Sequence, residues 1–247
     1  MAALPPNPQR VLAVMAHPDD IEFMAGGTMA RWARAGAELH YCLLTDGNSG
    51  SRDPSLTPAA LAELRRAEQR AAGAIFNVAS YSFLGQPDGR LVASIELRLA
   101  IAREIRRVQP DTVLTCDPCF FYSPMYINHP DHRAAAEATL AAIMPIANTR
   151  LAALELLEEG LEPHDVSTVY LASPDRATLW VPVEQQDLDR KVLAMHTHAS
   201  QIGNWDARGM LQRFATLAAE EARAHGVECE LAERYVRIAL RQPEAGN

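Results

Sequence analysis

Lysine is almost absent from this sequence of 247 residues: Lys191 is the only one, and arginine supplies all the other basic side chains. Acidic residues outnumber basic ones by 31 to 23, which gives a net charge of -8 at pH 7. Proteins whose main partner is nucleic acid or an anionic membrane surface usually carry an excess of positive charge. The composition therefore argues against both partners and favours an enzyme that acts on a small molecule.

No apolar run reaches the roughly 18 residues that a membrane-spanning helix needs. The first ten residues lack the charged segment and apolar core of a secretory signal peptide, so we expect a cytoplasmic protein. Four cysteines are too few for a disulfide framework in a chain of this length. Two of them, Cys116 and Cys119, form a CxxC pair in a Pro-containing loop, where we expect neither a zinc site nor a redox pair.

Apolar segments typical of strands alternate with helical segments along the first half of the chain. The expected strands are 11–16, 38–45, 81–84 and 112–115, and the expected helices are 26–35, 58–75, 94–108 and 133–144. This alternation predicts an α/β fold, namely a Rossmann-like, mostly parallel sheet with helices on both faces. The length suits one large domain, so we expect residues 1–247 to form a single domain.

The pattern weakens after Pro145 and becomes clear again in the last third of the chain. The segments expected there are strands 167–171 and 178–183, helices 184–195 and 205–225, and a final strand 234–240. Pro174 and Asp175, both common in turns, lie between the first two of these strands. We therefore interpret those two strands as a hairpin.

The segment Val11–Glu22 (VLAVMAHPDDIE) combines a strand-like run with one histidine and two aspartates. Residues Val11–Ala16 show no polar alternation, as expected for a strand covered by helices on both faces. His17, Asp19 and Asp20 follow at its carboxyl end, where open α/β sheets bind ligands. A turn that enters a helix can direct His17 and Asp20 to one point while Asp19 faces elsewhere. Imidazole and carboxylate are ordinary ligands of divalent metals, and a catalytic zinc site has three protein ligands.

A second motif, His129-Pro130-Asp131-His132, supplies the missing ligand. Proline and aspartate suit the first turn of a helix, and residues three apart lie on one helix face, so His129 and His132 point the same way. Helix capping alone could explain either motif. Both motifs together predict one metal site, because neither folding nor capping requires histidine at these positions.

A long loop, Cys116–Asn128, precedes the second motif and contains Phe120, Phe121, Tyr122 and Tyr126. Long loops at strand ends are often functional, and aromatic side chains there suit one wall of a substrate pocket. The same side chains could instead anchor the loop to the core. The sequence leaves both interpretations open.

The segments Ala16–Glu22 (AHPDDIE) and His129–His132 (HPDH) resemble the paired motifs of the PIG-L/LmbE-like zinc-dependent N-deacetylases. This family includes the mycothiol and bacillithiol pathway deacetylases and the archaeal diacetylchitobiose deacetylases. The resemblance covers most of the chain. Further similar segments are Thr45-Asp46-Gly47, Arg65-x-x-Glu68, Leu84-Gly85 to Gly89 with Asp88, Asp117-Pro118 and His198-x-Ser-Gln. The paired motifs are specific to the family but do not identify the substrate.

The resemblance implies a role for each site residue. His17, Asp20 and His132 would hold one zinc ion per chain. Asp19 would be the general base, and His129 would stabilise the oxyanion or protonate the departing amine. Zinc lowers the pKa of a bound water to about 7, and a neighbouring carboxylate can take its proton as the water attacks the acetamide carbon. The substrate-binding residues implied by the resemblance are Arg65, Asp88, Tyr126 and His198.

The implied reaction removes the N-acetyl group from a small N-acetylglucosamine-type substrate, an amino-sugar conjugate, and releases acetate. Relatives in this family are often oligomeric, which suggests a homo-oligomer. One alternative within the family is a different reaction, such as a zinc-dependent hydration of a carbon–carbon bond or the hydrolysis of an S-conjugate amide. The complete HPDD segment counts against the hydratase.

Two alternatives come from other classes of protein. Two histidines and one carboxylate also describe the facial triad of a non-haem iron oxygenase. The parallel α/β pattern and the additional Asp19 count against it. A non-catalytic protein that binds a sugar or a metal is the other alternative, but such a protein has no need of a base such as Asp19 or of His129.

Overall fold

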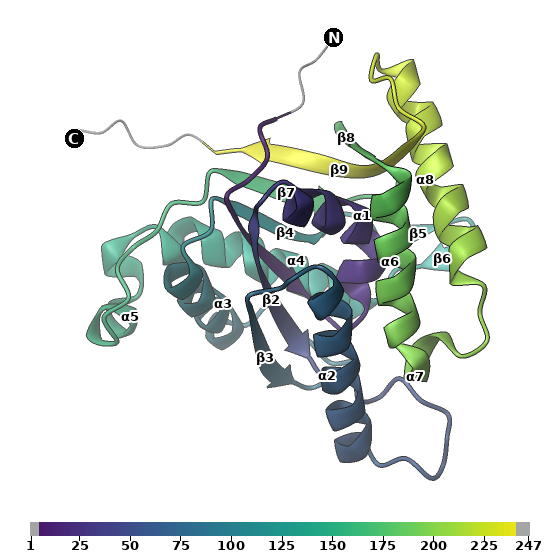
Figure 1. The fold of residues 1–247 in the computed structure, drawn as a ribbon. Helices are drawn as coiled ribbons and strands as arrows, with labels where there is room; N and C mark the ends of the chain where they lie inside the picture. Colours follow the sequence, from purple (N-terminus) through teal and green to yellow (C-terminus); the bar gives the residue numbers. More distant parts are fainter. Residues whose placement is uncertain (1–4, 241–247) are drawn as a thin grey trace.

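Seven strands form the central sheet of the molecule (Figure 1). The structure is a computed structural model and describes residues 5–240. In spatial order the strands are β3 (Ser80–Gln86), β2 (Glu38–Thr45), β1 (Arg10–Met15), β4 (Thr112–Cys116), β7 (Thr168–Ala172), β9 (Leu231–Ala239) and β8 (Leu179–Val183). The first five are mutually parallel, and β9 runs antiparallel to both of its neighbours. The predicted mostly parallel α/β sheet is confirmed.

Helices cover both faces of the sheet, as Figure 1 shows. They are α1 (Asp20–Arg34), α2 (Pro58–Ile75), α3 (Ile95–Val108), α4 (Pro130–Ala141), α5 (Leu154–Glu158), α6 (Gln185–Thr197), α7 (Ala199–Ile202) and α8 (Ala207–Ala224), with the short helical segments η1 (Ala142–Ala147) and η2 (Arg150–Ala152). Residues of α3 and α4 share one core with the sheet, and residues of α1, α2 and α6 share the other. Among residues 5–240 no helix has the length and apolar character to cross a membrane.

Strand β1 is apolar from Val11 to Met15 because both of its faces are buried there. Leu12 and Val14 belong to the core on the α3 and α4 side, whereas Val11, Ala13 and Met15 belong to the core on the α1 side. All five side chains are at most 1 % exposed. This two-sided burial explains the missing polar alternation in the sequence and places the end of β1 between two rigid layers.

The predicted hairpin of residues 167–171 and 178–183 is wrong. Strands β7 and β8 do not pair with each other, because β9 lies between them and bonds to both. Tyr235 of β9 pairs with Ala172 of β7 on one side and with Leu179 of β8 on the other, so β9 is an interior strand selected by contacts that are distant in the sequence. The short connection between β7 and β8 therefore passes over one strand.

Helix α1 begins at Asp20, six residues earlier than the predicted start at Gly26. Gly26 and Gly27 lie inside the helix, at the point where it approaches α6 and β9. A Cβ atom on Gly26 would lie 2.7 Å from Lys191 Cγ, and one on Gly27 would lie 3.1 Å from Glu233 Oε1. The glycines thus permit a close approach and do not mark the helix start.

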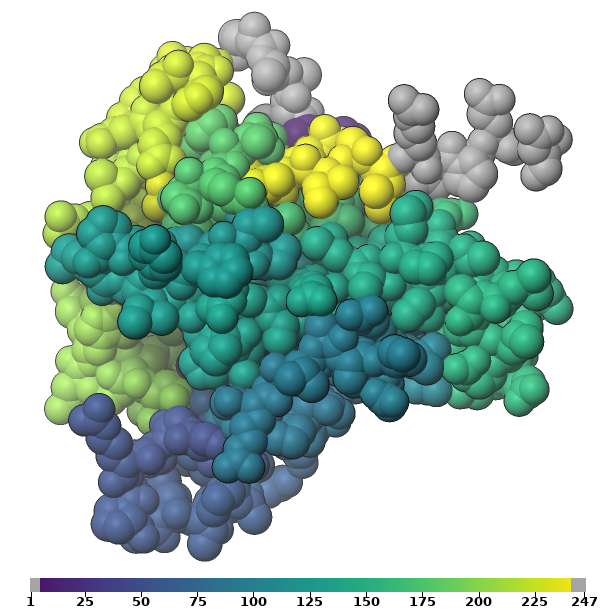
Figure 2. All heavy atoms as spheres, turned by 180° about the vertical axis from the view of Figure 1, so that it is seen from behind, coloured from purple at the N-terminus to yellow at the C-terminus, as the bar shows by residue number. Residues whose placement is uncertain are grey.

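The loop before the second motif folds back on itself as a small two-stranded sheet, β5 (Tyr122–Ser123) and β6 (Tyr126–Ile127). Figure 2 shows this teal segment at the surface, next to lime-green residues of α8. The side chains of Met125 and Ile127 are almost fully exposed, and that of Tyr126 is half exposed. The loop is therefore only partly anchored to the core.

A buried ion pair joins α1, α6 and β9. Lys191 Nζ lies 2.5 Å from Glu233 Oε1, and each side chain is 7 % exposed. Glu233 also accepts hydrogen bonds from the backbone N–H groups of Gly27 and Thr28 and from the Tyr235 hydroxyl. Burial would raise the pKa of Glu233, but Lys191 and the contacts with Thr28 lower it. The single lysine of the chain therefore balances a buried negative charge.

We expect Lys191→Met to lower the free energy of unfolding by about 3–5 kcal/mol, because Glu233 would remain buried without its cation. Chemical denaturation at pH 7 measures this loss. Arg208→Met is the matched control, since the side chains of Arg208 and its partner Asp189 are both about half exposed. The free energy of unfolding of Arg208→Met should fall by less than about 1 kcal/mol. Equal losses in the two variants would contradict a special role for the buried pair.

Candidate metal centre

The two histidine motifs meet at the carboxyl ends of β1 and β4. His17 follows β1 after one residue, Asp20 is the first residue of α1, and His132 lies in the first turn of α4. Because β1 and β4 are parallel neighbours, the segments that follow them emerge at the same edge of the sheet. The fold therefore brings together residues that are more than 100 positions apart in the sequence.

Asp20 lies between the two histidines. Its Oδ1 is 3.1 Å from His132 Nε2, and its Oδ2 is 3.4 Å from His17 Nδ1. One ligand atom from each of the three residues lies within 4.8 Å of the others, and all three residues are buried. Two imidazoles and one carboxylate at this spacing could hold a divalent cation.

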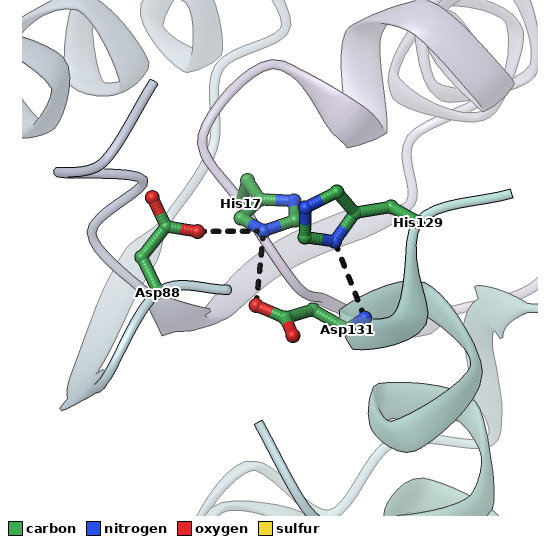
Figure 3. Close-up of side chains that lie close together, drawn as sticks. All are labelled: His17, Asp88, His129 and Asp131. Atoms are coloured by element: carbon green, nitrogen blue, oxygen red, sulfur yellow. Dashed lines mark hydrogen bonds and ion pairs between the residues drawn. The ribbon is translucent and has the colours of Figure 1, made fainter. Parts of the chain in front are cut away.

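Two further carboxylates face the other ring nitrogen of His17 (Figure 3). His17 Nε2 lies 3.1 Å from Asp88 Oδ1 and 3.4 Å from Asp131 Oδ2. Burial would lower the pKa of His17, but hydrogen bonds to Asp131, Asp20 and Asp88 outweigh it and raise the pKa to about 12. Three carboxylates around one imidazole concentrate negative charge, which a bound cation would balance. A carboxylate behind a ligand histidine also fixes the ring orientation.

Asn128 orients the second histidine in the same way, and the sequence interpretation missed it. Its Oδ1 lies 2.9 Å from His132 Nδ1, so His132 presents Nε2 to Asp20. The Asn128 amide group in turn donates to the Phe120 carbonyl, at 2.7 Å. The only sequence signal was a carboxamide directly before the HPDH motif.

Asp131 is a second residue whose role the sequence did not reveal, because a helix-capping role explained it. It is fully buried and accepts hydrogen bonds from the backbone N–H groups of Gly89 (2.7 Å) and Leu91 (3.1 Å). Asp88 similarly accepts from the Ser49 N–H, at 2.7 Å. These bonds hold both carboxylates in place behind His17.

A second group of possible ligands overlaps the first. His17, Asp88, His129 and Asp131 also offer ligand atoms within 4.8 Å of one another (Figure 3). Backbone N–H groups already bind both of its carboxylates. We therefore interpret Asp88 and Asp131 as support for His17 and place the candidate cation at His17, Asp20 and His132.

Asp19 adopts an unusual backbone conformation, with φ of 96°. Its carboxylate accepts from Arg65 Nη2 at 3.1 Å and is 24 % exposed. Burial raises the pKa of Asp19, Arg65 lowers it and Asp20 raises it, with a net value of about 6. A carboxylate with this pKa, next to a candidate metal ligand, is suited to accept a proton at neutral pH.

His129 packs against both candidate ligand histidines. Its ring centre lies 4.7 Å from that of His17 and 5.5 Å from that of His132. His129 Nδ1 accepts from the Asp131 backbone N–H, so a neutral His129 carries its hydrogen on Nε2. Burial and the neighbouring His17 lower the pKa of His129. Burial raises the pKa of Tyr126, Asp20 raises it further, and the backbone N–H of His129 opposes the rise.

Arg65, one of the predicted substrate-binding residues, lies almost completely inside the protein. Its guanidinium donates to the Gly47 carbonyl at 2.7 Å, to the Pro18 carbonyl at 2.5 Å and to Asp19. The side chain is thus bound to the turn that carries Asp19. Direct contact of Arg65 with a substrate stays a prediction, as it does for Asp88.

His198 and Tyr126, the other two predicted substrate residues, differ in exposure. His198 is fully buried, and its Nε2 lies 3.2 Å from Glu22 Oε2. Two residues further on, the Ser200 backbone and hydroxyl donate to Glu68 at 2.8 and 2.6 Å, which joins α7 to α2. Tyr126 is 51 % exposed. Of these two, Tyr126 has the side chain that a ligand from solvent can reach.

The CxxC pair takes no part in the candidate centre. Cys116 is buried with its sulfur 3.4 Å from that of Met15, whereas Cys119 is exposed, and both are free thiols. Within residues 5–240, neither of the two groups able to hold a metal contains a cysteine.

A family comparison matches the region that contains both histidine motifs. The model of the PIG-L family, described as GlcNAc-PI de-N-acetylase, matches residues 12–143, which is more than half of the chain. The chain belongs to the PIG-L family. The family predicted from the paired motifs is confirmed.

Individual relatives agree with this PIG-L assignment. The diacetylchitobiose deacetylase of Thermococcus kodakarensis is 30 % identical over 193 residues, which cover 78 % of this chain and 70 % of that protein. The 1D-myo-inositol 2-acetamido-2-deoxy-alpha-D-glucopyranoside deacetylase of Kineococcus radiotolerans is 32 % identical over 202 residues, which cover 69 % of this chain and 54 % of that protein. The structure of N,N'-diacetylchitobiose deacetylase from Pyrococcus horikoshii superimposes with a TM-score of 0.84 at 26 % identity, covering 97 % of this chain and 88 % of that one.

In this PIG-L protein we expect Asn128→Ala to weaken divalent-cation binding about 10- to 100-fold, because His132 would lose the acceptor that orients its ring. Competition with a chelating dye measures the dissociation constant. Asn148→Ala is the matched control, because Asn148 follows η1, away from the site, and bonds to the Thr149 hydroxyl. If both variants bind zinc as tightly as the parent protein, Asn128 does not orient His132.

Proposed function

We propose that this PIG-L protein is a zinc-dependent N-deacetylase, which hydrolyses the N-acetyl group of an N-acetylglucosamine-type substrate and releases acetate. One observation carries the proposal: the three-residue group of His17, Asp20 and His132 lies beside two side chains that can move protons, Asp19 and His129. The two relatives and the Pyrococcus horikoshii protein are all deacetylases, which supports the same reaction class.

The donor set fits zinc, and we propose one ion per chain, held by His17, Asp20 and His132. Two imidazoles and one carboxylate leave coordination positions open, as catalytic zinc sites require. When bound, zinc would polarise the amide carbonyl and lower the pKa of a water molecule to about 7. The same donors suit ferrous iron. The ionisable Asp19 favours hydrolysis, because an oxygenase does not need a general base at this position.

We propose that Asp19 is the general base. A pKa of about 6 leaves its carboxylate mostly ionised at neutral pH and still able to take a proton from water that attacks the acetamide carbon. That attack forms a new carbon–oxygen bond and a tetrahedral oxyanion. The carbon–nitrogen bond then breaks as Asp19 passes the proton it took from water to the amine nitrogen, and the acetic acid that is released ionises to acetate.

His129 is proposed to donate a hydrogen bond from Nε2 to the oxyanion. The lowered pKa of His129 favours a neutral ring, and the hydrogen bond from the Asp131 N–H to Nδ1 places the ring hydrogen on Nε2. The neutral ring can therefore donate from Nε2 without being protonated. Loss of one such donor typically costs about 100- to 1000-fold in kcat. The Tyr126 hydroxyl is proposed to face the substrate beside it.

The proposed substrate is a small amino-sugar conjugate. We propose that Tyr126, with its half-exposed side chain, contacts the sugar, and that Arg65 and Asp88 complete the binding site around it, whereas the fully buried His198 would act only from the interior. Arg65 and Asp88 would also support Asp19 and His17, because their polar atoms lie against those residues. Assembly into a homo-oligomer stays a prediction.

Asp19→Ala is expected to retain one zinc per chain and to lose about 100- to 10,000-fold in kcat, because the base is removed and the ligands remain. His17→Ala is expected to lose both zinc and activity. Zinc content by atomic emission and acetate release measure the two effects. The shape-matched variant Asp19→Asn should behave like Asp19→Ala, which controls for the loss of contact with Arg65. Equal zinc loss in the Asp19 and His17 variants would contradict the division of roles.

Acetate release tests the reaction itself. We expect zinc-dependent release from at least one of N-acetylglucosamine, diacetylchitobiose, and the inositol and malate glycosides of N-acetylglucosamine. Zinc-loaded and chelator-stripped protein are compared, with metal content measured in each sample. Release from none of them by protein that carries one zinc per chain would contradict the proposed function and favour a different acyl substrate or a hydratase.

A further inference from the structure

The backbone of Asp19 is held in a conformation that a residue with a Cβ atom rarely adopts. Its φ of 96° lies in the left-handed region. Asp19 directly precedes α1 as its N-cap residue, but its side chain makes no capping hydrogen bond. Its carboxylate instead accepts a hydrogen bond from Arg65 Nη2 at 3.1 Å. Such a conformation persists only where the surrounding structure enforces it.

Gln69 of α2 makes the contact that holds this backbone. Gln69 Oε1 accepts from the Asp19 N–H at 3.0 Å, and Gln69 is fully buried, so no water can replace it. Gln69 and Arg65 are four residues apart and lie on the same face of α2. Arg65 binds the carboxylate of Asp19, and Gln69 binds its backbone.

Glu22 determines which way the Gln69 amide points. Gln69 Nε2 donates to Glu22 Oε1 at 2.9 Å, and a carboxylate can only accept. The NH₂ group must therefore face Glu22, which leaves the amide oxygen for Asp19. The other oxygen of Glu22 lies 3.2 Å from His198 Nε2, and both Glu22 and His198 are fully buried. A chain of contacts thus runs from His198 through Glu22 and Gln69 to Asp19.

We propose that Gln69 is a positioning residue for the reaction: it fixes the Asp19 backbone so that the carboxylate faces the attacking water, and Glu22 and His198 orient its amide. This inference rests on the proposed role of Asp19 as general base. It gives His198 a function in the interior, through Glu22. It also explains why a glutamine lies buried in α2, where an apolar residue would pack without needing hydrogen-bond partners.

The first test is Gln69→Leu, which removes both hydrogen bonds at similar size. We expect kcat to fall about 10- to 100-fold, because the carboxylate of Asp19 would be displaced by up to about 1 Å. KM should change by less than about twofold, because ground-state binding is not affected. Zinc content should stay at one per chain. A parental kcat in this variant would overturn the proposal.

Thr28→Val is the matched control for lost stability. Thr28 is buried in α1, and its hydroxyl oxygen lies 2.8 Å from the Tyr235 hydroxyl oxygen, away from Asp19. Its replacement removes a buried hydrogen bond at constant shape. Comparable loss of stability in the two variants, with reduced kcat in Gln69→Leu alone, supports positioning. A similar reduction of kcat in both would overturn it, because general loosening of α1 would then be sufficient.

The second test exchanges the two polar groups. In the double variant Gln69→Glu with Glu22→Gln, the new carboxylate can accept from the Asp19 N–H and from the new amide, whose oxygen can accept from His198. Every hydrogen bond in the series from His198 to Asp19 is therefore retained. We expect kcat within about threefold of the parent, since the transition-state contacts are unchanged. A double variant as slow as Gln69→Leu would contradict the orienting role of Glu22.

A third measurement does not depend on catalysis. NMR of protein labelled with ¹⁵N-aspartate follows the Asp19 amide, which loses its acceptor in Gln69→Leu and keeps it in the double variant. We expect faster hydrogen exchange of this amide in Gln69→Leu only. Unchanged exchange would overturn the proposed contact. If the parent protein releases no acetate, the proposed function fails, and the amide measurement still tests the positioning contact.

Discussion

The negative charge gathered around His17 is the constraint on which the rest of the site depends. Three carboxylates, from Asp20, Asp88 and Asp131, face one buried imidazole, and they raise the pKa of His17. Buried carboxylates are costly unless hydrogen bonds and a cation compensate them. Backbone N–H groups from the loop after β2 and from the turn after β3 supply part of this compensation. Those connections are therefore structural parts of the cation site.

Helix α2 performs the corresponding task for Asp19. Arg65 binds the carboxylate of Asp19 and opposes the rise in its pKa that burial would cause. Gln69 binds the Asp19 backbone one helical turn further on. A single helix thus contacts both the carboxylate and the backbone of the proposed base. A displacement of α2 would therefore change the charge environment and the conformation of Asp19 together. The contact between Glu68 and Ser200 fixes α2 to α7 and extends this rigidity.

Features that belong to one continuous segment could be predicted from the sequence. The apolar run of β1 and the two histidine motifs are of this kind, because burial on two faces and the choice of histidine leave a local pattern. The pairing of β9 between β7 and β8 could not be predicted, since contacts across about 60 residues select it. Asn128 and Gln69 were missed for the same physical reason. A carboxamide has no distinctive spacing, and its role depends on the atoms that folding places opposite it.

Arg65 and Asp88 show how closely substrate contact and support are linked in this fold. Both match segments of the family pattern, and both have polar atoms directed at Asp19 or His17. Removing either side chain takes a charged partner away from Asp19 or His17, so lower activity alone would not reveal a lost sugar contact. Measuring KM and kcat separately distinguishes the two roles. A lost ground-state contact raises KM, whereas a displaced base or ligand lowers kcat. The buried position of Arg65 makes the second effect the larger one, since its guanidinium has three hydrogen bonds to the Asp19 turn and its surroundings.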